Sequence, residues 1–263
     1  MGTEENDKLS LAAALMDVAG TASLSNEELQ KEWYRLGSSF NFGAGENASG
    51  FSLSGLDEQF EASLELMMSA IKQPTTDDET LEQLKSILIK SRQELKSSPP
   101  AIANALNLYN RYGEESPMLE SLTTDEIRAT QLDELLSLPS DLLDYEHTLA
   151  YTGSMPLEQL VEALRRHHPL AGDLKQPPAY RFRTVREISA NEVYVVDQQT
   201  AQAQVRIEFA DGEYNANDRV PASVYTSYFG SGMSSVVFQE LREARALAYS
   251  ASARYGPGRR PKD

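Results

Sequence analysis

The sequence predicts an α+β fold, with two related domains in which helices cover mixed or antiparallel sheets. Long segments such as 57–72 and 76–95 carry apolar residues at the spacing of one helix face. Shorter runs at 38–42 and 50–54 alternate apolar and polar residues on either side of a Gly- and Asn-containing turn, as the strands of a hairpin do. Helices and short strands in mixed order favour this class over an all-helical or an all-strand fold.

The first part of the chain is expected to be mostly helical around that hairpin. Ser25 and Glu28 have the spacing of a capping box and predict a helix over 27–36, which Gly37 ends. A buried strand is expected at 147–152, with the sequence HTLAYT. Other helices are expected at 9–18, 57–72, 76–95, 101–109, 125–129, 131–138 and 156–167.

A proline-containing stretch divides the chain. Residues 169–183 contain three prolines and little periodicity, which indicates a linker. We therefore expect a first domain over 1–168, a linker over 169–190 and a second domain over 191–263. In the second domain, strands are expected at 192–196, 203–209 and 248–254, and helices at 222–229 and 234–245.

Composition excludes several classes of partner and site. The net charge of −16 repels phosphate backbones and anionic lipid, so we expect neither nucleic-acid nor membrane binding. Such a surface attracts basic peptides, although acidity also serves solubility alone. There are no cysteines, so disulfides and thiolate metal sites are excluded. No apolar run approaches the roughly 20 residues that span a bilayer, so we expect a soluble protein and leave periplasm and cytoplasm both open.

The three histidines, His147, His167 and His168, do not form a metal-binding motif. No H-x-x-E-H or H-x-x-x-H is present, so the pair of imidazoles that such motifs place one helical turn apart is missing. His167 and His168 end an expected helix and are interpreted as solvated residues at its C-terminus. His147 is interpreted as a structural hydrogen-bonding residue of the expected strand.

Other hydrolytic or nucleotide-binding motifs do not occur. The chain has no G-x-S-x-G sequence of the kind that presents a nucleophilic serine. The short Gly230-Ser231-Gly232 turn lies between two expected helices and lacks the pattern of a phosphate-binding loop. An independent hydrolytic site in this chain is therefore a poor hypothesis.

Arg242 and Tyr249 are the best candidates for a functional pair. A guanidinium offers several donors in a fixed plane, and a Tyr hydroxyl adds one donor on a rigid stem. On one continuous helix the seven residues between them would span about 10 Å, but the helix is expected to end near Ala246, which would let them approach. Taken alone, they also fit a solvated Arg and a Tyr in a strand core. Glu240 and Glu243 flank the Arg and are expected to decorate the helix surface rather than to hold it.

The string over 228–250, YFGSGMSSVVFQELREARALAYS, resembles the C-terminal half of the pitrilysin/insulinase family of zinc metallopeptidases. The resemblance extends over 8–95, 103–168 and 191–255, which is nearly the whole chain. It implies that Arg242 and Tyr249 hydrogen-bond the substrate peptide while the other half of the molecule holds zinc. Family members often have Gly at the place of Ala246, and their final domain is about as long as the first, so we expect part of it to be absent here.

The first domain resembles the family's zinc-bearing domain in a degenerate form. Gly20-Thr21 matches the Gly-Thr that follows H-x-x-E-H in the catalytic version. On that anchor, the first His, the Glu and the second His fall at Leu11, Ala14 and Leu15, all of which are apolar. The resemblance therefore implies a non-catalytic copy with no catalytic residue and no metal or other cofactor of its own.

Two functions follow from the resemblance. The leading one is the non-catalytic half of a zinc metalloendopeptidase, which encloses a peptide and orients its carbonyl while zinc and the general base lie on a partner half or subunit. The alternative is a proteolytically inactive peptide-binding or structural member of the family. The catalytic motif in an upstream half or a neighbouring subunit would distinguish them. The sequence leaves the substrate and the cleavage preference open.

We expect the purified, untagged chain to bind no stoichiometric zinc, because the positions that match the family's His, Glu and His are Leu11, Ala14 and Leu15. Elemental analysis of the dialysed protein checks this. One zinc ion per chain would contradict the non-catalytic assignment.

Overall fold

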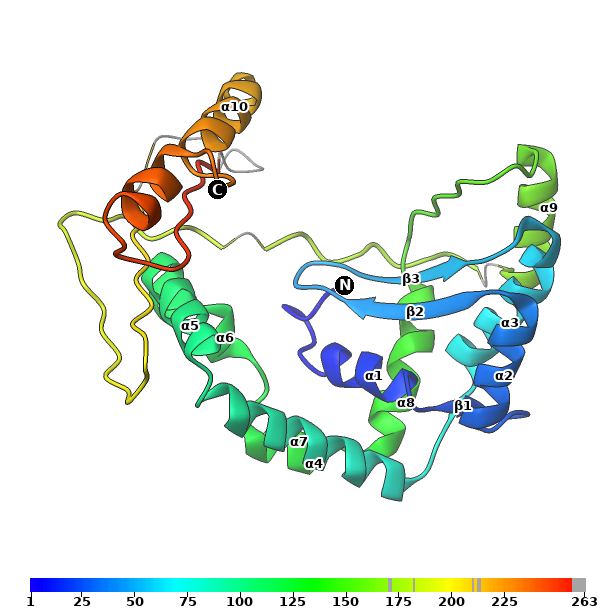
Figure 1. Cartoon of the computed structure of the whole chain (residues 1–263). Helices are drawn as coiled ribbons and strands as arrows, with labels where there is room; N and C mark the ends of the chain where they lie inside the picture. The colour runs from blue at the N-terminus through cyan, green and yellow to red at the C-terminus, as the bar shows by residue number, and fades with distance from the viewer. Residues whose placement is uncertain (170–171, 182, 210, 212–213, 257–263) are drawn as a thin grey trace. The chain divides into compact units, whose positions relative to one another are not determined.

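The computed structural model describes residues 1–169, 172–181, 183–209, 211 and 214–256. The chain divides into two compact units (Figure 1). Unit 1 comprises 1–102 and 119–181, and unit 2 comprises 103–118 with the described part of 182–263. This spatial division differs from the expected domains over 1–168 and 191–263, and those domains, with their functional division, stay a prediction.

Unit 1 contains most of the regular structure. Its helices are α1 (Leu9–Met16), α2 (Asn26–Leu36), α3 (Phe60–Lys72), α4 (Asp78–Leu95), α7 (Thr124–Ala129), α8 (Leu132–Asp141) and α9 (Leu157–His167). Its strands are β1 (Gly20–Thr21), β2 (Ser39–Ala44), β3 (Ser49–Ser54) and β4 (Pro74–Thr75). Two helices, α5 (Pro99–Tyr112) and α6 (Pro117–Glu120), cross the boundaries between the units.

The expected hairpin is present as β2 and β3, which pair antiparallel with Phe42 opposite Phe51. Helices α1, α2, α3 and α8 lie on one side of it (Figure 1). Strand alternation turns Phe42 into the main core, where it joins leucines of α1 and Leu135 of α8. The short strands β1 and β4 form a second antiparallel pair. The α+β class predicted from the sequence is confirmed.

Local sequence signals place the ends of α2. The Ser25 hydroxyl accepts from the Glu28 N–H, and the Glu28 carboxylate accepts from the Ser25 N–H, so the predicted capping box is confirmed. The backbone and side-chain hydrogen bonds from Ser25 lower the pKa of Glu28. Gly37 ends the helix with a φ of 59°, a left-handed conformation that glycine adopts without steric cost.

Unit 2 has less regular structure. Besides most of α5, it contains α10 (Arg219–Phe229), short 3₁₀ turns at Gly113–Glu115 and Ala216–Asp218, and a π-helical turn, η5 (Phe238–Glu243). Helix α10 begins three residues before the expected 222–229. The described residues contain no helix that combines the length and apolarity required to cross a membrane.

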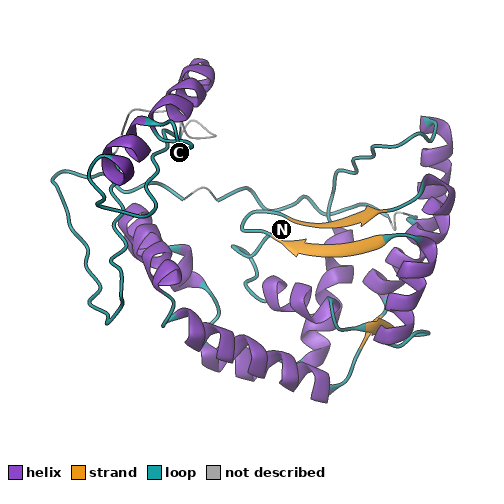
Figure 2. Ribbon diagram, in the orientation of Figure 1, coloured by secondary structure: helices purple, strands orange, loops and turns teal. Residues whose placement is uncertain are grey.

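Four strands expected from the sequence are not strands in the structure. Residues 192–196, 203–209, 147–152 and 248–254 are loops (Figure 2). Side-chain alternation favours a strand only where a neighbouring strand accepts its hydrogen bonds. The apolar residues of the first two segments stay exposed instead, with Val193 at 85% and Phe209 at 89%. At 147–152, the prediction of a buried strand was wrong for the same reason.

The loop around 147–155 is held by polar contacts instead. Asp57 accepts hydrogen bonds from the Tyr151 hydroxyl at 2.9 Å and from the Ser154 N–H at 2.9 Å, as well as from the Ser154 hydroxyl. The contacts from Ser154, followed by that from Tyr151, lower the pKa of Asp57. Side chains rather than a strand ladder therefore fix this segment.

The expected linker is extended, and its first part is bound to unit 1. The Lys175 N–H donates to the Asp144 carbonyl at 2.8 Å, and the Glu146 N–H donates to the Lys175 carbonyl at 2.8 Å. The Arg181 N–H donates to the side chain of Asn47 at 2.9 Å. Residues 170–171 and 182 of this linker, and the chain end at 257–263, lie outside the described residues.

Two histidines that the sequence separates by 21 positions form a pair. The Nε2 atoms of His147 and His168 lie 2.8 Å apart, and Nδ1 of His147 lies 2.7 Å from the Tyr145 carbonyl. A carbonyl oxygen can only accept, so Nδ1 of His147 donates its proton to it, and the contact between the two Nε2 atoms needs one proton shared between the rings. The interpretation of His168 as a solvated residue was wrong, because its ring is partly buried and its Nδ1 has no hydrogen-bond partner.

We expect the free energy of unfolding to fall as the pH drops below about 6.5, because of His168 in this pair. Burial, followed by the charges of His147 and Lys72, lowers the pKa of His168 below its ordinary 6.5. The unfolded chain therefore binds a proton at a pH where the folded chain does not, so stability is full above about pH 6.5 and is lost as the pH falls. Urea unfolding at several pH values measures this.

Replacing His168 by Gln should flatten the dependence, since Gln does not titrate. The carboxylates whose pKa is lowered, such as Asp57, protonate at lower pH and do not contribute in this window. An unchanged pH profile in H168Q would contradict the assignment of this dependence to His168.

Candidate functional site

The candidate site begins at the glycine turn after α10. Gly230 is buried, and its carbonyl accepts a hydrogen bond from the Ala253 N–H at 3.2 Å. A Cβ at position 230 would come within 1.9 Å of the Ala253 carbonyl oxygen, so only glycine allows the two segments to lie this close. Gly232 follows with a φ of +81°, which again suits glycine. The turn therefore brings 251–255 back beside the end of α10.

Ser235 starts the next helical segment. Its buried side chain donates to the Gly232 carbonyl at 2.9 Å and accepts from the Phe238 N–H at 3.4 Å. The helix expected over 234–245 is shorter in the structure and passes into the π-helical turn Phe238–Glu243. Ala244 closes that turn by donating to the Gln239 carbonyl at 2.8 Å. Such π turns are rare in proteins, and those that do occur are often located at functional sites.

The helical segment ends at Glu243, close to the expected end near Ala246, and Ala246 follows in a left-handed conformation with a φ of 50°. The Leu247 N–H donates to the Leu241 carbonyl at 2.8 Å, and the Ala246 N–H donates to the Arg242 carbonyl at 3.0 Å. This is the pattern of a helix C-terminus that reverses the chain, where glycine is the usual residue. The reversal directs 247–249 back toward the helical turn.

The reversal brings Arg242 and Tyr249 together. The guanidinium carbon lies over the Tyr249 ring, 4.9 Å from its centroid, and over the Phe238 ring, 4.7 Å from its centroid. Tyr249 is 81% exposed, and no hydrogen bond to its hydroxyl is recorded within the described residues. Arg242 is half-buried. The structure thus places two donor groups side by side, with the hydroxyl open to solvent.

Phe238 is a residue of this site that the sequence reasoning missed. It precedes Arg242 by four positions, a spacing at which helical side chains meet, and this spacing was the available signal. The two acidic neighbours behave differently from each other. Glu243 lies 3.6 Å from Nε of Arg242, and Glu240 pairs with Arg245 at 3.5 Å. Both pairs are exposed, so they add little stability.

The site offers hydrogen-bond donors but no nucleophile with an adjacent base. Arg242 and Tyr249 can donate to a carbonyl or carboxylate oxygen. Neither can generate an attacking hydroxide near neutral pH. The arrangement therefore suits binding and charge stabilisation of an acceptor oxygen.

The residues at the positions that match the family's His, Glu and His cannot bind a metal ion. Leu11 and Leu15 are 2% and 1% exposed within the core of unit 1, and Ala14, next to them on α1, is half-buried. Apolar side chains carry no lone pair for zinc. Among the residues that the structure describes, no three His, Cys, Asp or Glu side chains come together as a metal site.

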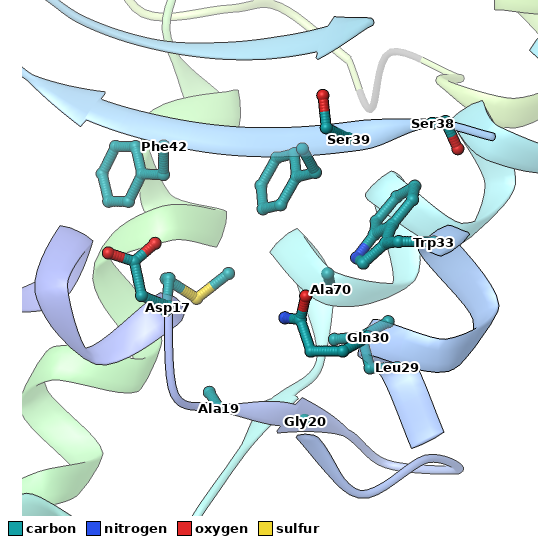
Figure 3. Close-up of a pocket in the computed structure, with 12 residues that line it drawn as sticks. Asp17, Ala19, Gly20, Leu29, Gln30, Trp33, Ser38, Ser39, Phe42 and Ala70 are labelled. Carbon is teal, nitrogen blue, oxygen red and sulfur yellow. The ribbon is translucent and has the colours of Figure 1, made fainter. Parts of the chain in front are cut away.

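A pocket of about 290 Å³ lies near the end of α1 in unit 1. Figure 3 shows the rings of Phe42 and Trp33 on one side of it and the amide of Gln30 reaching in from the other. Its lining contains one carboxylate, Asp17, and no histidine. Hydrolysis by a carboxylate pair or by a Ser–His system needs more groups than these, so the pocket carries no catalytic assignment.

We expect Ala246→Gly to raise the free energy of unfolding by about 0.5–1 kcal/mol. A left-handed conformation costs a residue with a Cβ about 1–2 kcal/mol, and the extra freedom of glycine in the unfolded chain returns part of that gain. Ala244→Gly is the matched control, because Ala244 has a right-handed φ of −77° and should lose stability on the same change. Urea unfolding measures both, and a destabilised A246G would contradict the left-handed turn.

Comparison with known proteins agrees with this picture. Residues 147–260 match the model of the peptidase M16 inactive domain. An uncharacterized zinc protease of Streptomyces coelicolor is 24% identical over 205 residues, which cover 74% of this chain and 44% of the relative. This chain therefore spans less than half the length of that curated relative.

Solved structures share the fold. A protease from Helicobacter pylori superposes with a TM-score of 0.64 at 16% identity, covering 98% of this chain and 64% of that one. A peptidase M16 inactive domain from Pseudomonas fluorescens gives a TM-score of 0.62 at 17% identity, covering 97% and 63%. The resemblance to the pitrilysin/insulinase peptidases is confirmed: residues 147–260, which include Arg242 and Tyr249, match the peptidase M16 inactive domain, and the curated relative is a zinc protease.

Proposed function

We propose that this chain is the non-catalytic half of a zinc metalloendopeptidase. In this proposal it helps to enclose a peptide substrate, and Arg242 and Tyr249 orient the carbonyl that is cleaved. Zinc and the general base belong to the other half, on the same polypeptide or on a neighbouring subunit. The match to an inactive domain and the zinc protease relative support this division of labour.

The proximity of Arg242 to the exposed Tyr249 is the observation that carries the proposal. Two donors that lie this close together can hydrogen-bond the same acceptor atom, whereas donors far apart would bind separate atoms. The guanidinium carbon lies 4.9 Å from the centre of the tyrosine ring, so the ring also contributes to holding the cation. Because the tyrosine is 81% exposed, its hydroxyl can reach a peptide without rearrangement of the core.

These donors suit the charge that develops during peptide hydrolysis. When water attacks a carbonyl carbon, negative charge gathers on the carbonyl oxygen. A cationic guanidinium and a phenol hydroxyl would stabilise that oxygen more than the neutral carbonyl of the bound peptide. Loss of one such donor costs on the order of 3 kcal/mol of activation free energy in other hydrolases.

The charge of the chain is compatible with peptide substrates that carry basic residues. A net charge of −16 raises the local concentration of cationic peptides at low ionic strength. Acidity for solubility alone would give the same composition, so charge supports the proposal without carrying it.

The alternative is a proteolytically inactive, peptide-binding or structural protein of the same fold. The contacts of Arg242 favour it to a degree, because an Arg that lies over two rings and beside Glu243 already has structural partners. In that case the pair would support the turn, and no turnover would depend on it.

Hydrolysis of a quenched fluorescent peptide by the complete protein distinguishes the two. We expect Arg242→Ala and Tyr249→Phe each to lower kcat by about 100-fold or more, since each removes one donor to the developing oxyanion. Steady-state kinetics with thermal unfolding of each variant measures this, and the melting temperature should stay close to that of the wild type.

Two control variants match these changes. Arg245→Ala removes an exposed Arg of the same turn that pairs with Glu240, and Tyr228→Phe removes a hydroxyl from an exposed Tyr on α10. Both should retain turnover. Unchanged kcat in R242A and Y249F would return the pair to a structural role, and a wild-type protein without turnover would favour the alternative function.

A further inference from the structure

We propose that Phe238 is a positioning residue that holds the Arg242 guanidinium in the orientation needed to meet a substrate carbonyl. This inference rests on the proposed function of Arg242. Phe238 does not reach the substrate in this account, and it acts only through the cation.

The geometry of the contact supports this role. The guanidinium carbon of Arg242 lies 4.7 Å from the centre of the Phe238 ring, slightly nearer than to the centre of the Tyr249 ring. An aromatic face attracts the cation through its quadrupole and does not occupy the N–H groups at the edge of the guanidinium. The contact therefore restricts the side chain while leaving its donors available.

The two rings are not equivalent. Tyr249 is 81% exposed and lies after the chain reversal, and its hydroxyl is the second proposed donor. Phe238 is half-buried and lies inside the π-helical turn. A ring fixed by its own surroundings is better suited to hold a flexible side chain than one that must itself engage the peptide.

Hydrogen bonds fix the backbone that carries Phe238. Its N–H donates to the buried Ser235 side chain, which in turn donates to the Gly232 carbonyl. The side chain of Gln239, the next residue, donates to the Met233 carbonyl at 2.6 Å. Ser235 thus links the glycine turn to the backbone of Phe238, the residue that lies against Arg242.

An unrestrained Arg would bind more weakly. A long side chain loses rotamer freedom when it is fixed by a ligand, and a contact present before binding removes part of that loss. The salt bridge to Glu243 restrains the Arg242 side chain less, because it is a single N···O contact of 3.6 Å in a solvent-accessible pair. Phe238 therefore supplies most of the preorganisation of the cation.

A double-mutant cycle in the complete protein tests this. The probe is a fluorescein-labelled peptide with an acetylated N-terminus and an amidated C-terminus, with binding measured by anisotropy and cleavage by kcat/KM. Phe238→Leu keeps apolar volume and removes the ring, and we expect it to weaken binding or kcat/KM by about three- to tenfold. In the Arg242→Ala background the same change should have no further effect, because the cation on which Phe238 acts is gone.

Phe238→Tyr retains an aromatic face and should behave as the wild type. The loss of the F238L effect in the R242A background then separates the contact with the cation from a structural change at Phe238. Tyr228→Leu, which removes an exposed ring of α10, is the matched control and should change nothing. Unchanged binding and turnover in F238L with R242A impaired would overturn this inference and leave the proposed function standing. So would an effect of F238L that adds fully to that of R242A. If R242A itself changes neither quantity, the proposed function and this inference both fail.

Discussion

The chain reversal at Ala246 is the constraint on which the candidate site depends. The Leu247 N–H bonds to the Leu241 carbonyl and the Ala246 N–H bonds to the Arg242 carbonyl, and these hydrogen bonds turn the chain back along the helical segment from which it came. Without the reversal, Arg242 and Tyr249 would lie about 10 Å apart along a continuing helix. Gly230 supplies a second constraint. Residues 251–255, which follow the reversal, can lie beside the end of α10 only because Gly230 has no side chain. Both constraints are properties of the backbone, and the positions of Arg242 and Tyr249 follow from them.

In unit 1, the positions at which the resemblance places a catalytic site belong to the hydrophobic core. Leu11 and Leu15 stand where the resemblance places zinc ligands, and they pack with Phe42 and Leu135 in the main core. Full burial of each leucine contributes about 1.5–3 kcal/mol relative to an exposed one. An unpaired histidine or glutamate in these positions would instead have to lose its hydration inside the protein. The absence of metal ligands in α1 is therefore also a contribution to the stability of this unit.

Sequence patterns predicted those parts of the structure that depend on neighbouring residues in the chain. These parts rest on contacts within a few positions of the chain, and they are present in the structure. They are the capping box of Ser25 and Glu28, the amphipathic helices, the β2–β3 hairpin and the helix end near Ala246. The segments 192–196 and 203–209 have the alternation of strands but no strand beside them in the described residues, and pairing is a property that a single segment does not encode. His147 and His168 meet only through the tertiary fold. Arg242 and Tyr249 could be singled out as a pair, whereas the four-residue spacing alone did not single out the ring of Phe238 that lies beside them.

The contacts of Arg242 divide into one that a ligand would keep and one that it would replace. The ion pair with Glu243 is exposed, and such pairs contribute at most about 1 kcal/mol, so a peptide carbonyl can displace the carboxylate at little cost. The aromatic contact differs, because the ring binds the face of the guanidinium whereas acceptor oxygens bind its edge. A bound carbonyl and the Phe238 ring therefore do not compete for the same part of the cation. The turn can hold Arg242 in place before a peptide arrives and continue to hold it while the peptide is bound, which is the condition that a preorganised donor has to meet.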